Sequence, residues 1–141
     1  IVEKVAQVGI AGPVERYSVK YVNLIQAPTL AEQIAKINMA VRVGDVEAKD
    51  DHLSVQVHRN EDDTLHIMSV VTGAQGAMPD GKTVFGAVVD IDSIRTAHFS
   101  DFGAFAAQLE PAVESLRQAN KTKFFSCLTE ATINEMGPKY D

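Results

Sequence analysis

Two aspartates near the end of an apolar run are the first residues whose types and spacing could do chemistry. Asp90 and Asp92 lie where the run that begins at Val84 comes to its end. Residues two apart on a strand point to the same face, so the two carboxylates are expected to lie side by side. Such a pair can hold Mg²⁺ or Mn²⁺ together with further oxygen ligands or a substrate phosphate. The same spacing also fits a strand that leaves the core and meets solvent, with an aspartate capping the next turn.

Two histidines and the single cysteine offer further side chains for chemistry. If residue 58 lies opposite residue 66 in a hairpin, the rings of His58 and His66 lie side by side and could share a transition metal. A register shift of one residue would separate them, and they would then be ordinary polar strand residues. Cys127 lies on a predicted helix with Phe124 and Leu128, which is typical of a buried structural thiol.

A small-molecule pocket between a sheet and its helices is a third candidate site. Aromatic side chains with a few polar neighbours are the usual lining of such pockets. The same residues would also make an ordinary core. The candidate lining residues are Tyr17, Tyr21, Asn23, Phe85, Phe102 and Phe105.

Patterns in the first half of the chain predict the elements that would position these residues. Alternation predicts a strand over residues 15–25, with Tyr17, Tyr21 and Asn23 on one face. Thr29 and Glu32 have the spacing of a capping box, and the apolar stripe that follows predicts an amphipathic helix over residues 30–41.

The second half of the chain reads as three strands followed by helices. The first two strands, residues 53–57 and 65–71, alternate like a hairpin, and three glycines and a proline in residues 72–82 indicate a connecting loop. A nearly continuous apolar stretch over residues 84–91 is typical of a central strand buried on both faces. An apolar helical stripe follows between Phe102 and Leu128, and Thr129 could cap a last short helix.

This order, α-β-α-β-β-β-α-α, predicts an α+β fold. Consecutive strands joined by short turns must be antiparallel, so we expect a mainly antiparallel four-stranded sheet with helices packed on one face. The strand–helix–strand unit at residues 16–58 could be a right-handed crossover, which would make one pair of strands parallel. Residues 1–141 are expected to form a single domain.

Composition and charge exclude several classes of protein. The 19 acidic against 13 basic residues give a net charge of −6, which argues against nucleic-acid binding through the overall field. No apolar run approaches the roughly 20 residues of a membrane-spanning helix. One cysteine permits no intrachain disulfide, so a reducing compartment, the cytoplasm, is expected. The sequence requires no cofactor.

Three motifs in order resemble a known protein family. They are Lys20-Tyr-Val-Asn-Leu-Ile25, Val88-Val-Asp-Ile-Asp92 and the segment from Leu116 to Thr129 with its Phe-Phe pair. Together they resemble the C-terminal half of a sporadically distributed bacterial protein family of unknown function, although Leu24 and Arg117 stand where that family has an arginine and a histidine. The resemblance implies a missing N-terminal half. Helical spacing of apolar residues over residues 1–9 points the same way.

These observations favour an uncharacterised bacterial protein with a non-catalytic role, either ligand binding or protein interaction. A nucleophile, a base and an oxyanion site do not come together in the sequence. Expected partners are a second copy of the chain or the missing half, through sheet edges or the first helix. Two alternatives stay open: a divalent-metal-dependent enzyme that acts on a phosphate or nucleotide through Asp90 and Asp92, and a small-molecule binder with the aromatic pocket named above.

Overall fold

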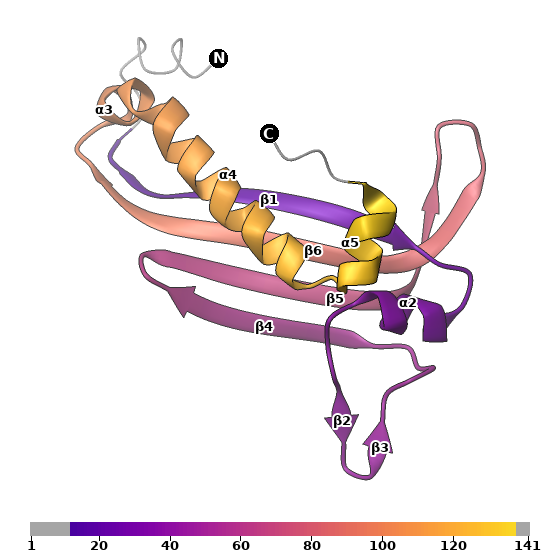
Figure 1. Ribbon diagram of the computed structural model, residues 1–141. Coiled ribbons are helices and arrows are strands. Elements are labelled where there is room, and N and C mark those ends of the chain that lie inside the picture. Colours follow the sequence, from indigo (N-terminus) through magenta and orange to yellow (C-terminus); the bar gives the residue numbers. More distant parts are fainter. Residues whose placement is uncertain (1–11, 138–141) are drawn as a thin grey trace.

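A four-stranded antiparallel sheet forms the centre of the molecule in a computed structural model that describes residues 12–137 (Figure 1). The strands lie in the order β1-β6-β5-β4, and every neighbouring pair is antiparallel. A small hairpin of β2 and β3 projects away from this sheet. The strands are β1 (Val14–Gln26), β2 (Arg42–Val43), β3 (Val46–Glu47), β4 (Ser54–Glu61), β5 (Thr64–Ala77) and β6 (Thr83–Phe99).

The helices gather on one face of the sheet, and the longest of them lies across β6 and β1 (Figure 1). Side-chain oxygens of Thr29, Asp101 and Thr129 accept backbone N–H bonds at the starts of three helices, which satisfies donors that have no partner inside a helix. The helices are α2 (Leu30–Lys36), α3 (Phe102–Ala107), α4 (Leu109–Ser126) and α5 (Glu130–Met136).

The core lies between α4 and the middle of the sheet. Val89 and Ile91 of β6 are fully buried there, as is Leu116 of α4. Odd-numbered residues of β1 and β6 share the covered face because residues two apart on a strand point the same way. Even-numbered residues therefore lie on the face that no described helix covers.

The predicted α+β class and mainly antiparallel four-stranded sheet are confirmed, but the crossover considered for residues 16–58, which would make one pair parallel, does not form. β1 pairs with β6, from the far end of the chain, and the two strands run antiparallel. The strand–helix–strand unit at residues 16–58 therefore places its two strands at opposite edges of the sheet. The helix expected over residues 1–9 lies outside the described residues.

The second predicted helix, residues 30–41, ends early at Lys36. Ile37 adopts an extended conformation and forms an isolated bridge with Leu128, in the linker between α4 and α5. Asn38 also donates its N–H to the Cys127 carbonyl at 2.7 Å. Backbone pairing with a distant segment thus replaces the last helical turn, although the apolar spacing continues.

The glycine-rich segment 72–82 is mostly strand and not connection, since β5 runs to Ala77 and β6 starts at Thr83. The register breaks between Val71 and Ala74, where Thr72 and Gly73 of β5 lie opposite the single residue Ala87 of β6 and form a bulge of one extra residue. Gly73 has a positive φ of 75° in this bulge and donates its N–H to Gln33 Oε1 at 2.7 Å. This hydrogen bond holds the bulge in place. The pairing of β5 with β6 then resumes at Ala74, in a segment whose sequence pattern indicates a loop.

Candidate functional site

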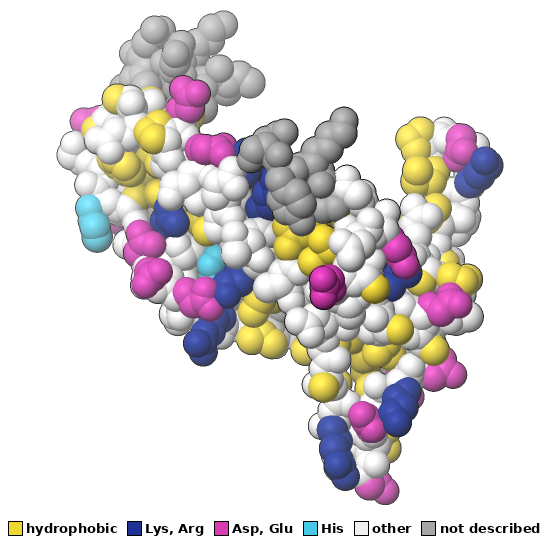
Figure 2. Space-filling view, viewed as in Figure 1, with side chains coloured by type: hydrophobic (Ala, Val, Ile, Leu, Met, Phe, Trp, Pro, Cys, Tyr) yellow, Lys and Arg dark blue, Asp and Glu magenta, His cyan; other side chains and the backbone are white. Residues whose placement is uncertain are grey.

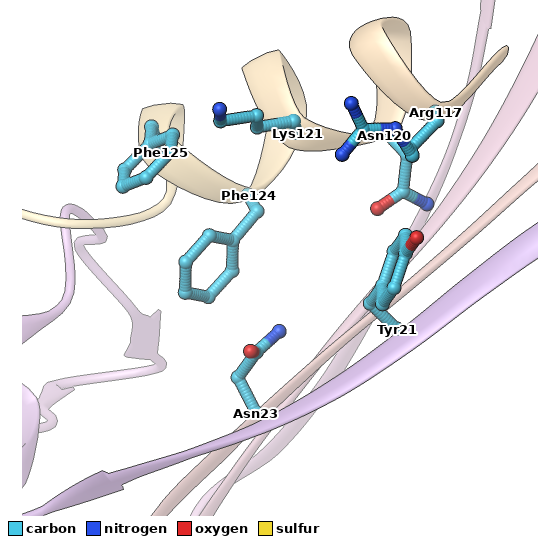
Figure 3. A pocket seen from close by; sticks show the side chains of 7 residues that line it. All are labelled: Tyr21, Asn23, Arg117, Asn120, Lys121, Phe124 and Phe125. Carbon is cyan, nitrogen blue, oxygen red and sulfur yellow. The ribbon is translucent and has the colours of Figure 1, made fainter. Parts of the chain in front are cut away.

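A pocket of about 210 Å³ lies between the edge strand β1 and helix α4 (Figure 3). We call it the β1–α4 pocket. Alternation on β1 points its two strand residues toward the helix, and spacings of three and four residues place five side chains on one face of α4. The lining residues are Tyr21, Asn23, Arg117, Asn120, Lys121, Phe124 and Phe125.

Asn120 forms the base of the pocket and is fully buried. The two N–H groups of its Nδ2 are shared among three acceptors, the carbonyls of Val19 at 3.0 Å and Ile91 at 2.8 Å and the Oγ of Ser93 at 2.9 Å. Its Oδ1 is buried and has no hydrogen-bond partner among the described residues. Because Asn120 is 0 % exposed, neighbouring side chains cover this oxygen, and it does not open onto the space between Tyr21 and Phe124 (Figure 3). A buried polar atom without a partner is rare in folded proteins.

Two cations lie along the rim of this pocket, on α4 (Figure 3). Arg117 forms a two-pronged contact with Glu114, with Nε–Oε2 at 2.8 Å and Nη2–Oε1 at 3.0 Å, and this contact helps to lower the pKa of Glu114 to about 2. Lys121 makes no ion pair with any residue in the described range 12–137. Acidic and basic side chains are interspersed over this side of the molecule (Figure 2).

A buried hydrogen-bond chain runs from Asn120 beneath α4. Ser93 Oγ accepts from Asn120 and lies 2.8 Å from His66 Nδ1. These two hydrogen bonds therefore connect Asn120, at the β1–α4 pocket, to His66. The ring of His66 lines a second hollow of about 230 Å³ next to the β4–β5 turn.

Burial, and then the Lys123 cation, lower the pKa of His66 from 6.5. As the pH falls through about 6.5, the unfolded chain therefore takes up this proton before the folded protein does. We expect the free energy of unfolding to be at its full value above pH 6.5 and to decrease as the pH falls toward the lower pKa of the folded state. Glu61 titrates below this window, because its hydrogen bond to Lys123 lowers its pKa from 4.5.

Urea denaturation between pH 7.5 and 5.5 measures this dependence. The variant His66→Gln should lose most of the decrease that the wild type shows. The variant His58→Gln is a matched control, since His58 is exposed and should leave the decrease in place. Equal slopes for wild type and His66→Gln would contradict the assignment of a neutral, buried His66.

The candidate metal site of Asp90 and Asp92 lies on the opposite face of the sheet, which no described helix covers. Both carboxylates are on one face, but Asp90 pairs with Lys20 at 3.0 Å, which raises the pKa of that lysine. Asp92 Oδ1 is buried without a hydrogen-bond partner in the described part of the chain, in a hollow that Arg16 also lines. Residues 12–137 contain no group of three or more His, Cys, Asp or Glu side chains suited to a metal. The metal site stays a prediction.

The predicted histidine pair does not form, because the hairpin register differs by one residue. His58 lies opposite Ile67, and His66 lies opposite Arg59. Since a shift of one residue moves a side chain to the other face, the two rings lie on opposite sides of the sheet. Cys127 is partly buried at the end of α4, and burial raises the pKa of its thiol, which does not favour a nucleophile.

The six predicted pocket residues lie in three places. Tyr21 and Asn23 line the β1–α4 pocket. Phe105 contacts Tyr17 and Phe102 with ring centroids 5.7 and 6.0 Å apart, in an aromatic cluster at the α3 end that also includes Phe99. Phe85 lies opposite Gln75 near the β5–β6 turn.

Sequence reasoning missed Asn120, the residue at the base of the pocket. A signal was available, because Asn120 occupies the position four residues from both Leu116 and Phe124 in the buried stripe of α4. A polar side chain on such a stripe is buried by its neighbours and needs partners.

No family model, curated protein or solved structure matches this chain. The resemblance to a bacterial family therefore stays a prediction. None of the described helices has the length and apolar character needed to cross a membrane.

Proposed function

We propose that this chain is a non-catalytic binding domain and that its ligand is a small molecule held in the β1–α4 pocket. The observation that carries the proposal is the pocket itself, in which Tyr21, Asn23 and Phe124 surround one open space between β1 and α4 (Figure 3).

The chemistry of the pocket walls also supports a binding role. The lining combines three aromatic rings with two carboxamides and two cations, the mixture of apolar and few polar groups typical of ligand sites. At about 210 Å³ the pocket is smaller than the roughly 300–1,000 Å³ of drug-sized sites, which favours a small metabolite. A strand and an 18-residue helix hold the walls, and Asn120 is anchored by its own hydrogen bonds.

The lining residues favour binding over catalysis. They include no Ser, Cys, His, Asp or Glu, the residues that most often act as nucleophile or general base. The protein-interaction role that the sequence also favours, and assembly with a second copy, stay predictions.

A screen of a small-molecule library by NMR tests the proposed function. The proton–nitrogen spectrum of the labelled full chain reports each backbone amide and the side-chain NH₂ groups of Asn23 and Asn120. We expect hits to shift the Asn23 and Asn120 signals. The variant Tyr21→Ala should weaken these hits, and Val22→Ala should not, because Val22 is the next residue and lies on the other face of β1. Hits that shift only other regions, or no hits, would contradict the proposal.

A metal-dependent enzyme that acts on a phosphate or nucleotide is the second candidate function. The observation that favours it is the unpartnered oxygen of Asp92, next to the carboxylate of Asp90 on the same face. Mn²⁺ added to the same NMR sample would broaden signals around residues 90–94 if this site holds a metal. Broadening there that disappears in Asp90→Asn/Asp92→Asn would favour this candidate over the binding domain.

A further inference from the structure

The β1–α4 pocket also indicates which class of ligand it takes, an inference that rests on the proposed function. Two features carry the inference: an accessible carboxamide on the β1 side, and aromatic rings on either side of the space above it. The carboxamide calls for hydrogen-bonding groups on the ligand, and the rings call for a flat body. Together they define a class of molecule.

The accessible carboxamide belongs to Asn23. In contrast to the fully buried Asn120, Asn23 is partly exposed. Figure 3 shows its carboxamide directed away from β1, into the space between Tyr21 and Phe124. Its side chain makes no hydrogen bond to any residue in the range 12–137. Asn23 can therefore bind a ligand without losing a bond within the fold.

A carboxamide offers an N–H donor beside a C=O acceptor. It pairs best with a ligand edge that has an acceptor beside a donor, because two parallel hydrogen bonds then form, as when asparagine binds the edge of adenine. The pairing does not depend on which way the Asn23 carboxamide is turned. A ligand with such an edge can turn over and present the same two groups in the opposite order.

The rings at the sides of the pocket suit a flat body. Tyr21, from β1, and Phe124, from α4, lie on opposite sides of the space above Asn23 (Figure 3). Tyr21 is 45 % exposed, which leaves part of its ring free to contact a ligand. Aromatic side chains favour stacked or edge-to-face contacts with another ring. The pocket volume of about 210 Å³ restricts the body to about one ring with short substituents.

We propose that the β1–α4 pocket binds a small planar ring that carries an amide edge, with an N–H donor beside a C=O acceptor. The amide edge pairs with the Asn23 carboxamide through two hydrogen bonds, and the ring lies between Tyr21 and Phe124. The edge has two possible sources, a carboxamide attached to the ring or a lactam within the ring. Both sources give the same pairing with Asn23.

Two pairs of probes test the amide edge in NMR titrations of the labelled full chain. Benzamide has the edge on a substituent, and acetophenone has the same shape with a methyl group in place of the NH₂. 2-Pyridone has the edge within the ring, and 1-methyl-2-pyridone has lost its N–H. In the pair that binds better, the probe with the N–H should bind at least about fivefold more tightly, since its partner leaves the Asn23 oxygen unpaired. That pair also identifies the source of the edge.

Replacing Asn23 with aspartate should change which edge is preferred. A carboxylate only accepts hydrogen bonds, so it repels the C=O of benzamide but pairs with the two N–H groups of benzamidine, a cation of the same shape. We expect Asn23→Asp to weaken benzamide at least about fivefold and to strengthen benzamidine about three- to tenfold.

The variant Gln26→Glu is the matched control for Asn23→Asp. It makes the same chemical change at an exposed position of β1, on the other face of the sheet. It should therefore leave the affinities for benzamide and benzamidine unchanged. The backbone signals in the same spectra verify that both variants are folded.

Two results would overturn the ligand class. Equal binding of each probe and its partner without the N–H would show that Asn23 does not select an amide edge. If the library molecules that shift the Asn23 and Asn120 signals carry no such edge, the class is wrong and the proposed binding function stands. If no molecule shifts these signals, both proposals fail.

Discussion

Replacing Asn120 with alanine is expected to lower the free energy of unfolding by about 2–4 kcal/mol, one of the two largest effects predicted for this protein. The change removes the hydrogen bonds from Nδ2 to the Val19 and Ile91 carbonyls and to Ser93 Oγ, all beneath α4. It also leaves a small cavity where the carboxamide was packed. Urea denaturation measures the loss, and the melting temperature should fall by about 10 °C.

Two further variants make the Asn120 experiment specific. Gln118→Ala removes an exposed carboxamide of the same helix that bonds only to Glu114, and should change stability by less than about 0.5 kcal/mol. Asn120→Asp keeps the shape but points a carboxylate at carbonyl oxygens, so it should destabilise more than alanine at pH 7. Equal stability of the Asn120→Ala and Gln118→Ala variants would show that the hydrogen bonds of the Asn120 carboxamide do not stabilise the fold.

Replacing Gly86 with alanine is expected to destabilise the protein by about 3 kcal/mol through overpacking. A Cβ at this position would lie 2.4 Å from the carbonyl oxygen of Ile25 and 2.9 Å from its carbonyl carbon. These are backbone atoms of β1, and residue 86 pairs with Gln26 in that strand, so β1 must move away from β6. The movement should also disturb the β1–α4 pocket, because Tyr21 and Asn23 lie on the same strand.

The variant Gly76→Ala is the matched control for Gly86→Ala. Gly76 is also a strand glycine, but a Cβ there meets only side-chain carbons, at 3.4 Å from Val84 and 3.6 Å from Leu24. Its stability should equal or slightly exceed that of the wild type, since alanine restricts the unfolded chain more than glycine does. Urea denaturation measures both variants. Similar losses of stability would mean that the close approach of β1 to Gly86 does not determine the cost of a side chain at position 86.

Buried hydrogen bonds link Asn120, Ser93 and His66, the residues on which the predictions about stability, pH and binding depend. Asn120 contacts β1 and β6 and forms the base of the pocket, and Ser93 connects it to His66 of β5. A ligand in the β1–α4 pocket would therefore bind between a helix and a strand that Asn120 already joins. Stabilisation of the fold by a ligand follows from such binding to the native state alone.

Several features of the fold could be predicted because they depend on neighbours in the chain. Alternation placed Tyr21 and Asn23 on one face of β1, and both line the pocket. Thr29 and Thr129 were expected to cap helices, and both accept backbone N–H bonds there. Periodicity and capping arise within a few residues, so the local pattern contains the information.

By itself, then, the amino-acid sequence determined the α+β class, the strand faces and most helix starts. The tertiary structure alone decided the register of the β4–β5 hairpin, the early end of α2 at Ile37, and the separation of the aromatic residues into different clusters. It also decided the role of Asn120, which bonds to Val19, 101 positions earlier in the chain. These outcomes depend on atoms that meet only when distant segments pack, and no pattern over neighbouring residues encodes which atoms those are.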